Sequence, residues 1–338
     1  MIAALLVVLA LPALADSVRI AVFHTDLGRD GPGLLLRDIR RQDADVLAAR
    51  DAILEARPDI LLLLDLDHDL DALALTAFAD LLAQGGLTLP NRFAPRPNTG
   101  LATGLDLDGD GRTGTADDAQ GWGRFAGAGG MALLSRWPLM GDTLVDHSTR
   151  LWRDLPGARL PRVDGALFPS EAVFAAQRLS TTNHWELAVD TPGAPLTLLA
   201  WHAGPPAFGG PHGRNRLRNG DETAFWRLRL EGALGPAPRA PFVLLGGANL
   251  DPARGDGDHA QIRALLRLAT LQDPEPRAAH PPAGAPPTAT GWWPEGPGAL
   301  RVDYLLPAAG LRVLDAGLIW PAGTAHHALV WADLAWPP

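Results

Sequence analysis

The sequence contains no cysteine and no lysine, and it has only one tyrosine and three methionines among 338 residues. The lack of cysteine excludes a disulfide framework, a thiolate metal site and a lipoprotein attachment site. The 29 basic residues are all arginine and stand against 38 acidic residues, which gives a formal net charge of -9. Because a nonspecific grip on nucleic acid needs a positive face, this charge argues against one. Local arginine patches at 214–218 and 227–229 remain open, although the charge of a surface helix is the simpler explanation.

Long apolar segments are also scarce, and the longest one lies at the start of the chain. Residues 1–15 read MIAALLVVLALPALA, which is too short to span a bilayer comfortably and ends in a small-x-small signature typical of a signal-peptide cleavage site. We therefore expect a signal peptide at 1–15, export to the periplasm or the medium, and no stable membrane anchor. With 47% hydrophobic residues, the remaining chain can bury a large core, as one α/β domain or as two smaller ones.

Several apolar runs that predict buried strands end in polar residues. Residues 242–245 lead through Gly246 and Gly247 to Asn249, and the runs 17–23, 59–64 and 196–201 end at His24, Asp65 and His202. Near the C-terminus, 301–306 carries Asp303, and the predicted strand at 326–334 opens on His326 and His327. Helices predicted at 45–57, 71–83 and 260–268 alternate with these strands, which indicates an α/β protein. A rigid sheet holds such strand-end side chains while solvent reaches them, so we expect chemistry there.

The segment 106–118, DLDGDGRTGTADD, has the spacing of a calcium-binding loop. Asp106, Asp108 and Asp110 alternate, Gly111 supplies a sharp turn, and Asp117 stands at position twelve, where aspartate replaces the usual glutamate. Calcium prefers several oxygen ligands, and these carboxylates supply them. The alternative is a solvated acidic turn without an ion. No helical period precedes the segment, so it is a loop inside a long connection and not a full helix-loop-helix hand.

Together the strand ends resemble the endonuclease/exonuclease/phosphatase superfamily, which includes deoxyribonuclease-like and sphingomyelinase-like phosphodiesterases. The resemblance is closest to an exported bacterial branch that has an Asp-rich loop, here at 106–118, and a GxxGMxxLSRxP segment, here at 127–138. It implies an α/β (α+β) four-layer sandwich of two stacked mixed β-sheets flanked by helices, formed by residues 16–338 as a single domain. The site would lie where strands of both sheets end.

The resemblance implies a metal-assisted attack of water on a phosphodiester. In that chemistry a His-Asp pair handles the proton, and a second histidine with asparagine steadies the phosphoryl oxygens. Four residues match the family's catalytic motifs: His202, Asn249, Asp303 and His327. A polar helix start is typical of the branch, and it is matched here by Arg214, Asn215, Asp221 and Glu222. Of these, Arg214 and Asn215 are candidates for substrate binding.

Four residues depart from the family pattern. His24 replaces an asparagine, Asp65 a metal-binding glutamate, and Gly247 and His326 each an aspartate. The last two changes remove about two negative charges from a site built for a hard divalent cation. They also predict that His327 has lost the carboxylate that orients its ring. The metal ligands expected here, Asp65, His24 and His326, favour Zn²⁺ or Mn²⁺ over Mg²⁺.

Three interpretations follow. The protein is a metal-dependent phosphodiester hydrolase with an altered site, or a pseudoenzyme that keeps the fold and binds a phosphate-bearing or other ligand, or a protein whose working surface lies elsewhere while calcium only stabilises it. The substrate of a hydrolase would be a phosphorylated small molecule, a lipid head group or nucleic acid. The loops show no run of alternating aromatic and basic residues that would select nucleic acid. No partner protein is expected.

Overall fold

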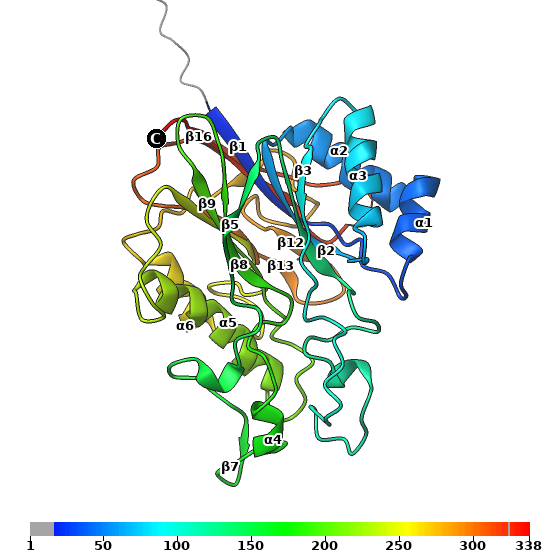
Figure 1. The fold of residues 1–338 in the computed structure, drawn as a ribbon, viewed down its shortest axis with the longest axis vertical. Coiled ribbons are helices and arrows are strands. Elements are labelled where there is room, and N and C mark those ends of the chain that lie inside the picture. Colours follow the sequence, from blue (N-terminus) through cyan, green and yellow to red (C-terminus); the bar gives the residue numbers. More distant parts are fainter. Residues whose placement is uncertain (1–16, 324) are drawn as a thin grey trace, which may run out of the picture.

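The computed structural model describes residues 17–323 and 325–338, so the expected signal peptide lies outside the described residues. Two large β-sheets stack face to face, and helices cover the outer face of each (Figure 1). This arrangement confirms the predicted four-layer sandwich of two mixed sheets. Among the described helices, none is long and apolar enough to cross a membrane.

The first sheet has seven strands in the order β11-β15-β16-β1-β2-β4-β3. Its members are β1 (Ser17–His24), β2 (Ile60–Leu66), β3 (Asn91–Phe93), β4 (Gly130–Ser135), β11 (Arg277–Ala278), β15 (Val313–Ile319) and β16 (Leu329–Ala335). The pair β1–β2 is parallel, while β1 pairs with β16 in the antiparallel sense. The strand that ends in His24 and the strand that carries Asp65 next to its end therefore run side by side in the same direction.

The second sheet has five strands in the order β14-β10-β9-β8-β5. They are β5 (Leu139–Asp146), β8 (His184–Val189), β9 (Leu196–His202), β10 (Phe242–Gly247) and β14 (Asp303–Pro307). Here β9 and β10 are the parallel pair. Two short ribbons complete the strands: β6 (Arg162–Val163) with β7 (Ala166–Leu167), and β12 (Gly291–Trp293) with β13 (Gly298–Leu300).

Helices α1 (Leu34–Arg41), α2 (Ala44–Ala56) and α3 (Leu73–Gln84) cover the first sheet, while α5 (Arg214–Leu230) and α6 (His259–Leu266) cover the second. A single turn, α4 (Glu171–Phe174), and two 3₁₀ turns, Ala116–Asp118 and Trp152–Asp154, lie in the long connections. Helix α1 precedes the predicted helix at 45–57 and was not among the predicted helices. Buried Leu35 and Ile39, spaced by four, give this helix its inner face.

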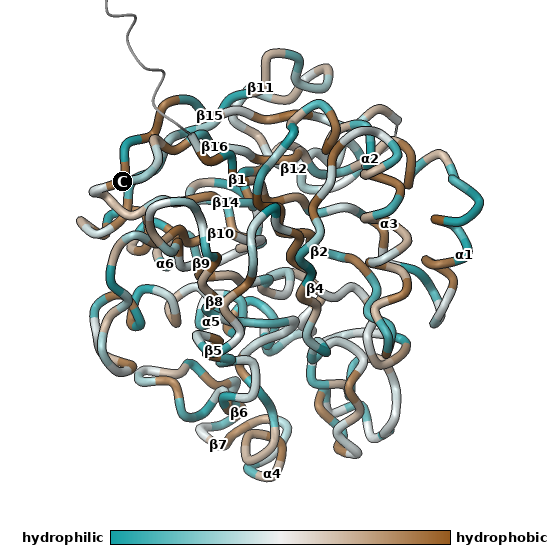
Figure 2. Tube along the Cα trace, turned by 45° about the horizontal axis from the view of Figure 1, so that its top comes forward, coloured by the Kyte–Doolittle hydropathy of each residue, from teal (hydrophilic) through white to brown (hydrophobic). Residues whose placement is uncertain are grey.

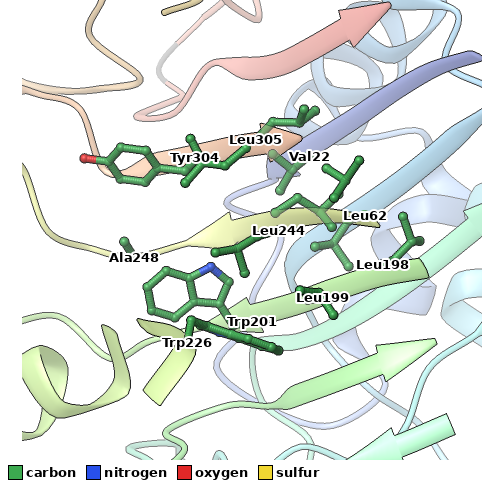
Figure 3. Packing of buried hydrophobic residues seen from close by; sticks show 14 of the residues in the cluster. Val22, Leu62, Leu198, Leu199, Trp201, Trp226, Leu244, Ala248, Tyr304 and Leu305 are labelled. Carbon is green, nitrogen blue, oxygen red and sulfur yellow. The ribbon is translucent and has the colours of Figure 1, made fainter. Parts of the chain in front are cut away.

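Alternation of side chains along the central strands builds two cores. Val22 and Leu62 point between the sheets and join one cluster, while Ala21 and Leu61 point outward and join another under α1 to α3. Figure 3 shows Val22 and Leu62 facing Leu244 of the second sheet. The apolar segments concentrate in these inner strands, and polar segments gather in the peripheral loops (Figure 2). The packed sheets form the rigid base on which the strand ends are held.

Candidate functional site

Strand register brings His24 and Asp65 together at one end of the first sheet. In the parallel pair, His24 lies opposite Leu64, the residue before Asp65. The hydroxyl of Thr25 donates to the carbonyl oxygens of Leu64 and Asp65, each at 3.0 Å. These bonds tie the two strand ends together, so the imidazole and the carboxylate are fixed near the same edge.

Register also aligns His202 with Asp303 in the second sheet. Gly247, at the end of β10, lies opposite His202 on one side and Asp303 on the other. A Cβ atom added at Gly247 would lie 3.0 Å from Cδ2 of His202, 3.1 Å from Cδ1 of Leu64 and 3.4 Å from Oδ1 of Asp303. Because Leu64 belongs to the first sheet, the two sheets approach closely here, and a side chain at 247 would be crowded.

Three polar residues at these strand ends have left-handed backbone conformations. The φ angles of Asp26, Asp65 and Asn249 are 53°, 54° and 50°. Side chains other than glycine rarely adopt this region, although aspartate and asparagine tolerate it best, and such residues cluster at functional sites. The turn at each strand end therefore directs a polar side chain at some conformational cost.

A cleft of about 790 Å³ opens over these strand ends. Six of the residues predicted for the active site and substrate binding line it: His24, Asp65, His202, Asn249, Arg214 and Asn215. Two others, Asp303 and His327, are buried and do not line it, and His326 lies outside it with half of its side chain exposed. Folding thus divides the candidates into a set that lines the cleft, a buried pair beside it, and His326 outside it.

The buried pair is His327 with Asp303. Nδ1 of His327 lies 2.8 Å from Oδ2 of Asp303, within hydrogen-bond distance. The prediction that His327 has lost its orienting carboxylate was therefore wrong, because the carboxylate comes from β14 and not from the neighbouring position 326. The ring of His24 stacks on that of His327 with centroids 3.9 Å apart and planes inclined by 13°. His24, which lines the cleft, thus lies against a histidine that does not.

His24 is held in a strongly acidic environment. Its Nδ1 atom lies 3.3 Å from Oδ1 of Asp26. Burial lowers the pKa of His24, but the carboxylates of Asp26 and Asp65 outweigh burial and raise that pKa to about 9. Burial raises the pKa of Asp26, yet the close pairing with His24 and the charge of that ring bring it well below its usual range. His24 is therefore an imidazolium at neutral pH, paired with an ionised Asp26.

His202, in contrast to His24, is uncharged at neutral pH. Its ring centroid lies 5.1 Å from that of His24, edge to face. Burial lowers the pKa of His202 well below its ordinary value, and the charge of His24 lowers it further. Within the described chain, neither Nδ1 of His202 nor Oδ1 of Asp303 has a hydrogen-bond partner, although both atoms are buried. Unsatisfied buried polar atoms are costly and indicate a place for a ligand or water.

Helix α5 supplies a cleft residue that sequence reasoning did not single out as functional, Glu222. Its Oε1 accepts from the amide of Thr181 at 2.6 Å, and its Oε2 accepts from the amide of Gly204 at 3.0 Å. Burial raises the pKa of Glu222 to about 7. Its neighbour Asp221 points away and accepts from the indole of Trp152 at 2.7 Å. Glu222 thus fixes two loops of the cleft wall, while Asp221 belongs to the structural core.

The donor atoms near His24 fit a borderline metal better than Mg²⁺. Ligand atoms of His24, Asp26 and His327 all lie within 4.8 Å of one another. This set mixes imidazole nitrogen with carboxylate oxygen, whereas Mg²⁺ prefers an octahedron of oxygens. Nearly parallel stacked rings direct their nitrogen lone pairs side by side, so His24 and His327 can share one ion only if a ring turns. Asp26 is therefore a candidate metal ligand, and it was absent from the predicted ligands Asp65, His24 and His326.

The Asp-rich loop folds into a turn stabilised by its own carboxylates. Asp106 accepts from the amides of Gly109 and Gly111 at 2.6 and 2.8 Å. Ligand atoms of Asp106, Asp108 and the buried Asp118 lie within 4.8 Å of one another. Asp118 was not among the predicted ligands. The predicted Asp110 instead accepts from the amide of Arg112 at 2.8 Å, and the predicted Asp117 lines the cleft.

Arg214 connects the Asp-rich loop to the cleft. Its guanidinium donates to the carbonyl oxygen of Leu107 and, at 3.5 Å, to that of Asp117. Asn215, the next residue of α5, donates through Nδ2 to the carbonyl oxygen of Ala207 at 2.9 Å. Both side chains are therefore partly occupied in holding loops, and both still border the cleft.

Comparisons with known proteins agree with this architecture. Residues 28–331 match the model of the Endonuclease/Exonuclease/phosphatase family. The fold resembles an endonuclease/exonuclease/phosphatase from Beutenbergia cavernae DSM 12333, with a TM-score of 0.56 and 18% identity over 94% of this chain and 71% of that chain. It also resembles sphingomyelinase C from Streptomyces griseocarneus, with a TM-score of 0.51 and 15% identity over 94% and 99% of the two chains. No curated protein matches the sequence. At these identities the structural likeness establishes the fold alone.

Proposed function

Because this chain belongs to the endonuclease/exonuclease/phosphatase family, we propose that it hydrolyses phosphoesters in the cleft above the strand ends, with the help of a divalent metal ion. The observation that carries the proposal is the convergence of three histidines on one site. His24 is in ring contact with both His202 and His327, although β1, β9 and the segment that precedes β16 are far apart in the sequence. This convergence argues against the interpretation in which the working surface lies elsewhere and the polar strand ends have no shared role.

The residues of the site can divide the work of hydrolysis. His327, whose tautomer Asp303 would fix, would hold the proton of the attacking water. His202, uncharged because of its burial, and the amide of Asn249 would steady the phosphoryl oxygens. His24 lies over His327, so substrate and water would reach His327 only when the His24 ring turns aside. This chain would therefore be slower than family members with an asparagine at that position.

A metal ion would be held on the acidic side of His24. His24 and Asp26, with Nδ1 and Oδ1 3.3 Å apart, would supply imidazole and carboxylate donors, which fit Mn²⁺ or Zn²⁺, and Asp65 lines the same cleft. Bound there, the ion would polarise the phosphoryl group and lower the pKa of a nearby water. His24 must lose a proton to become a ligand, so metal and proton would compete for this ring.

The same proposal includes export and a second metal ion. Residues 1–15 carry the composition of a signal peptide, which would place the mature protein in the periplasm or the medium. Asp106, Asp108 and Asp118 would hold Ca²⁺ in the loop at 106–118, where the motif spacing and the gathered carboxylates support it. The substrate would carry a phosphoester, as part of a small molecule, a lipid head group or a nucleic acid.

A second candidate is a pseudoenzyme that binds a phosphate-bearing ligand without turnover. Two observations favour it: Gly247 supplies no carboxylate, and a Cβ atom at that position would be crowded by Leu64 and His202. In that case the imidazolium of His24 would act as a fixed positive charge for the ligand. The two candidates share the cleft and differ in whether a phosphoester bond breaks.

Turnover of bis-p-nitrophenyl phosphate by the purified mature protein, measured with Mn²⁺, Zn²⁺, Mg²⁺ and Ca²⁺, tests the proposal. We expect release of p-nitrophenol with Mn²⁺ or Zn²⁺, and its loss in His202→Ala. Leu314→Ala, at an exposed position of β15 outside the cleft lining, is the matched control and should retain full activity. Binding of inorganic phosphate without release of p-nitrophenol under any ion would support the pseudoenzyme.

A further inference from the structure

The aromatic side chains that are exposed to solvent gather at the cleft. The sequence has 11 Trp, 9 Phe and 1 Tyr. Among the described residues, only Trp122 and Phe208 are exposed aromatics, with 57% and 90% of their surface accessible. Both line the cleft. Aromatic rings usually contribute to a core, so two that are exposed at the same opening indicate a binding role.

Trp122 is presented by a rigid stretch of backbone. The preceding residue, Gly121, donates to the carbonyl oxygen of Asn98 at 3.1 Å and accepts from the amide of Gly100 at 2.8 Å. A Cβ atom at Gly121 would lie 2.0 Å from the carbonyl oxygen of Thr181, so the close approach requires glycine. Because both backbone groups of Gly121 are bonded, the residue before Trp122 is fixed and the indole is held at the cleft without being buried.

Phe208 is presented in a similar way by the loop before α5. The amide of Arg214 donates to the carbonyl oxygen of Gly209 at 3.2 Å, and Asn215 donates to that of Ala207, so both neighbours of Phe208 are bound to the helix start. Phe208 has a φ of 63°, a left-handed conformation that costs free energy for a side chain of this size. An exposed ring on a strained backbone adds little to the stability of the fold, so we look for the role of Phe208 in the cleft.

We propose that the cleft recognises phosphoesters that carry a nucleobase, with the base stacked on Trp122 and Phe208. The inference rests on the proposed function and names its substrate class. Aromatic side chains present flat faces on which every base can stack. The guanidinium of Arg124 lies over one face of the Trp122 ring, 5.8 Å from its centroid, and is paired with Asp30 of the cleft lining. This arrangement suits a planar ring better than a flexible acyl chain.

The charges around the cleft indicate a short nucleotide and not a long strand. Arg29 lines the cleft, but its guanidinium is paired with Asp38 and Asp45 at 2.8 and 2.6 Å. Arg214 lies within the field of Asp108, Asp117 and other carboxylates of the Asp-rich loop. A long strand needs a continuous track of basic groups for its phosphates, and the net charge of -9 opposes one. A nucleoside phosphate or a dinucleotide needs only the stacking faces and one phosphate site.

Binding and turnover can be measured separately. Isothermal titration calorimetry compares thymidine 5′-monophosphate with glycerol phosphate, which has the phosphate but no base. Turnover compares thymidine 5′-monophosphate p-nitrophenyl ester with glycerophosphocholine. The variants are Trp122→Leu and Phe208→Leu, which keep apolar bulk, and Trp122→Phe and Phe208→Tyr, which keep a ring. Both positions are exposed, so we expect all four variants to fold, and circular dichroism will verify this.

Wild type should bind the thymidine compound at least about fivefold more tightly than glycerol phosphate, and each leucine variant should lose about fivefold or more of that preference. The ring-keeping variants should retain most of it. Equal binding of the two phosphates by wild type, or leucine variants that keep the preference, would overturn the inference, as would a preference of turnover for glycerophosphocholine. If no phosphoester is cleaved but the stacking preference is present, the proposed function fails and this inference stands. Turnover without any base preference refutes this inference alone.

Discussion

Replacing His24 with asparagine, the residue of the family pattern, should remove a pH dependence from the stability of the protein. In the fold, Asp26 and Asp65 raise the pKa of His24 to about 9, against an ordinary value of 6.5. A group whose pKa is raised by folding stabilises the native state below its unfolded pKa, and this stabilisation disappears as the pH rises through the folded pKa. Wild type should therefore lose stability between pH 6.5 and 9 that His24→Asn does not lose.

The size of the effect follows from the two pKa values. They differ by about 2.5, and each pKa unit corresponds to about 1.4 kcal/mol, so the imidazolium of His24 contributes about 3 kcal/mol at pH 6. The side chain is 13% exposed, so solvent screens its pairing with Asp26 only weakly. The difference in unfolding free energy between wild type and His24→Asn should shrink by about 3 kcal/mol from pH 6 to pH 10.

Urea unfolding with metal chelated, followed by circular dichroism at pH 6, 8 and 10, measures this difference. Asp26→Asn should remove most of the same pH dependence, since it removes the carboxylate closest to His24. His280→Asn, at an exposed histidine outside the cleft lining, is the matched control and should leave the pH dependence unchanged. A stability difference between wild type and His24→Asn that is the same at pH 6 and pH 10 would refute the reasoning.

Three further predictions concern the metal ions and the core. Metal-free protein should bind Mn²⁺ up to about tenfold more tightly for each pH unit from 7 to 9, because metal and proton compete for His24. A dissociation constant, measured by calorimetry, that does not change with pH would count against His24 as a ligand. Excess Ca²⁺ should raise the melting temperature of wild type but not of Asp106→Ala/Asp108→Ala, and an unchanged wild-type melting curve would remove the loop site. Asp221→Asn should lower the free energy of unfolding by about 2–3 kcal/mol, because Asp221 accepts hydrogen bonds from Trp152 and from Arg159, both at 2.7 Å. It should leave KM unchanged, since Asp221 points away from the cleft. A changed KM with unchanged stability would contradict a structural role for Asp221.

The strand ends were predictable because each is a buried apolar run that stops at a polar residue. Residues 17–23 and 196–201 have this pattern, and the structure places His24 and His202 at the ends of β1 and β9. The order of strands in each sheet was not predictable, because register and crossovers depend on contacts between distant segments. The family resemblance supplied the stacked-sheet arrangement, which the periodicity alone did not specify.

Two features of the site lay beyond sequence reasoning for physical reasons. The carboxylate that pairs with His327 comes from Asp303 on another strand, so the residue at position 326 gave a misleading signal. On α5, adjacent residues point about 100° apart, and only the packing of the helix decides that Glu222 faces the cleft while Asp221 faces the core. Local sequence identified the carboxylates, and tertiary structure assigned their roles.

One comparison tests most directly whether the cleft is catalytic: single-turnover cleavage of bis-p-nitrophenyl phosphate by wild type and by Gly247→Asp/His326→Asp, which restores the two family aspartates. We expect wild type to cleave the ester with Mn²⁺ or Zn²⁺, and we expect no large gain with those ions in the double variant, because Leu64 and His202 crowd position 247. An inactive wild type beside an active double variant would contradict the account and identify the natural protein as a pseudoenzyme.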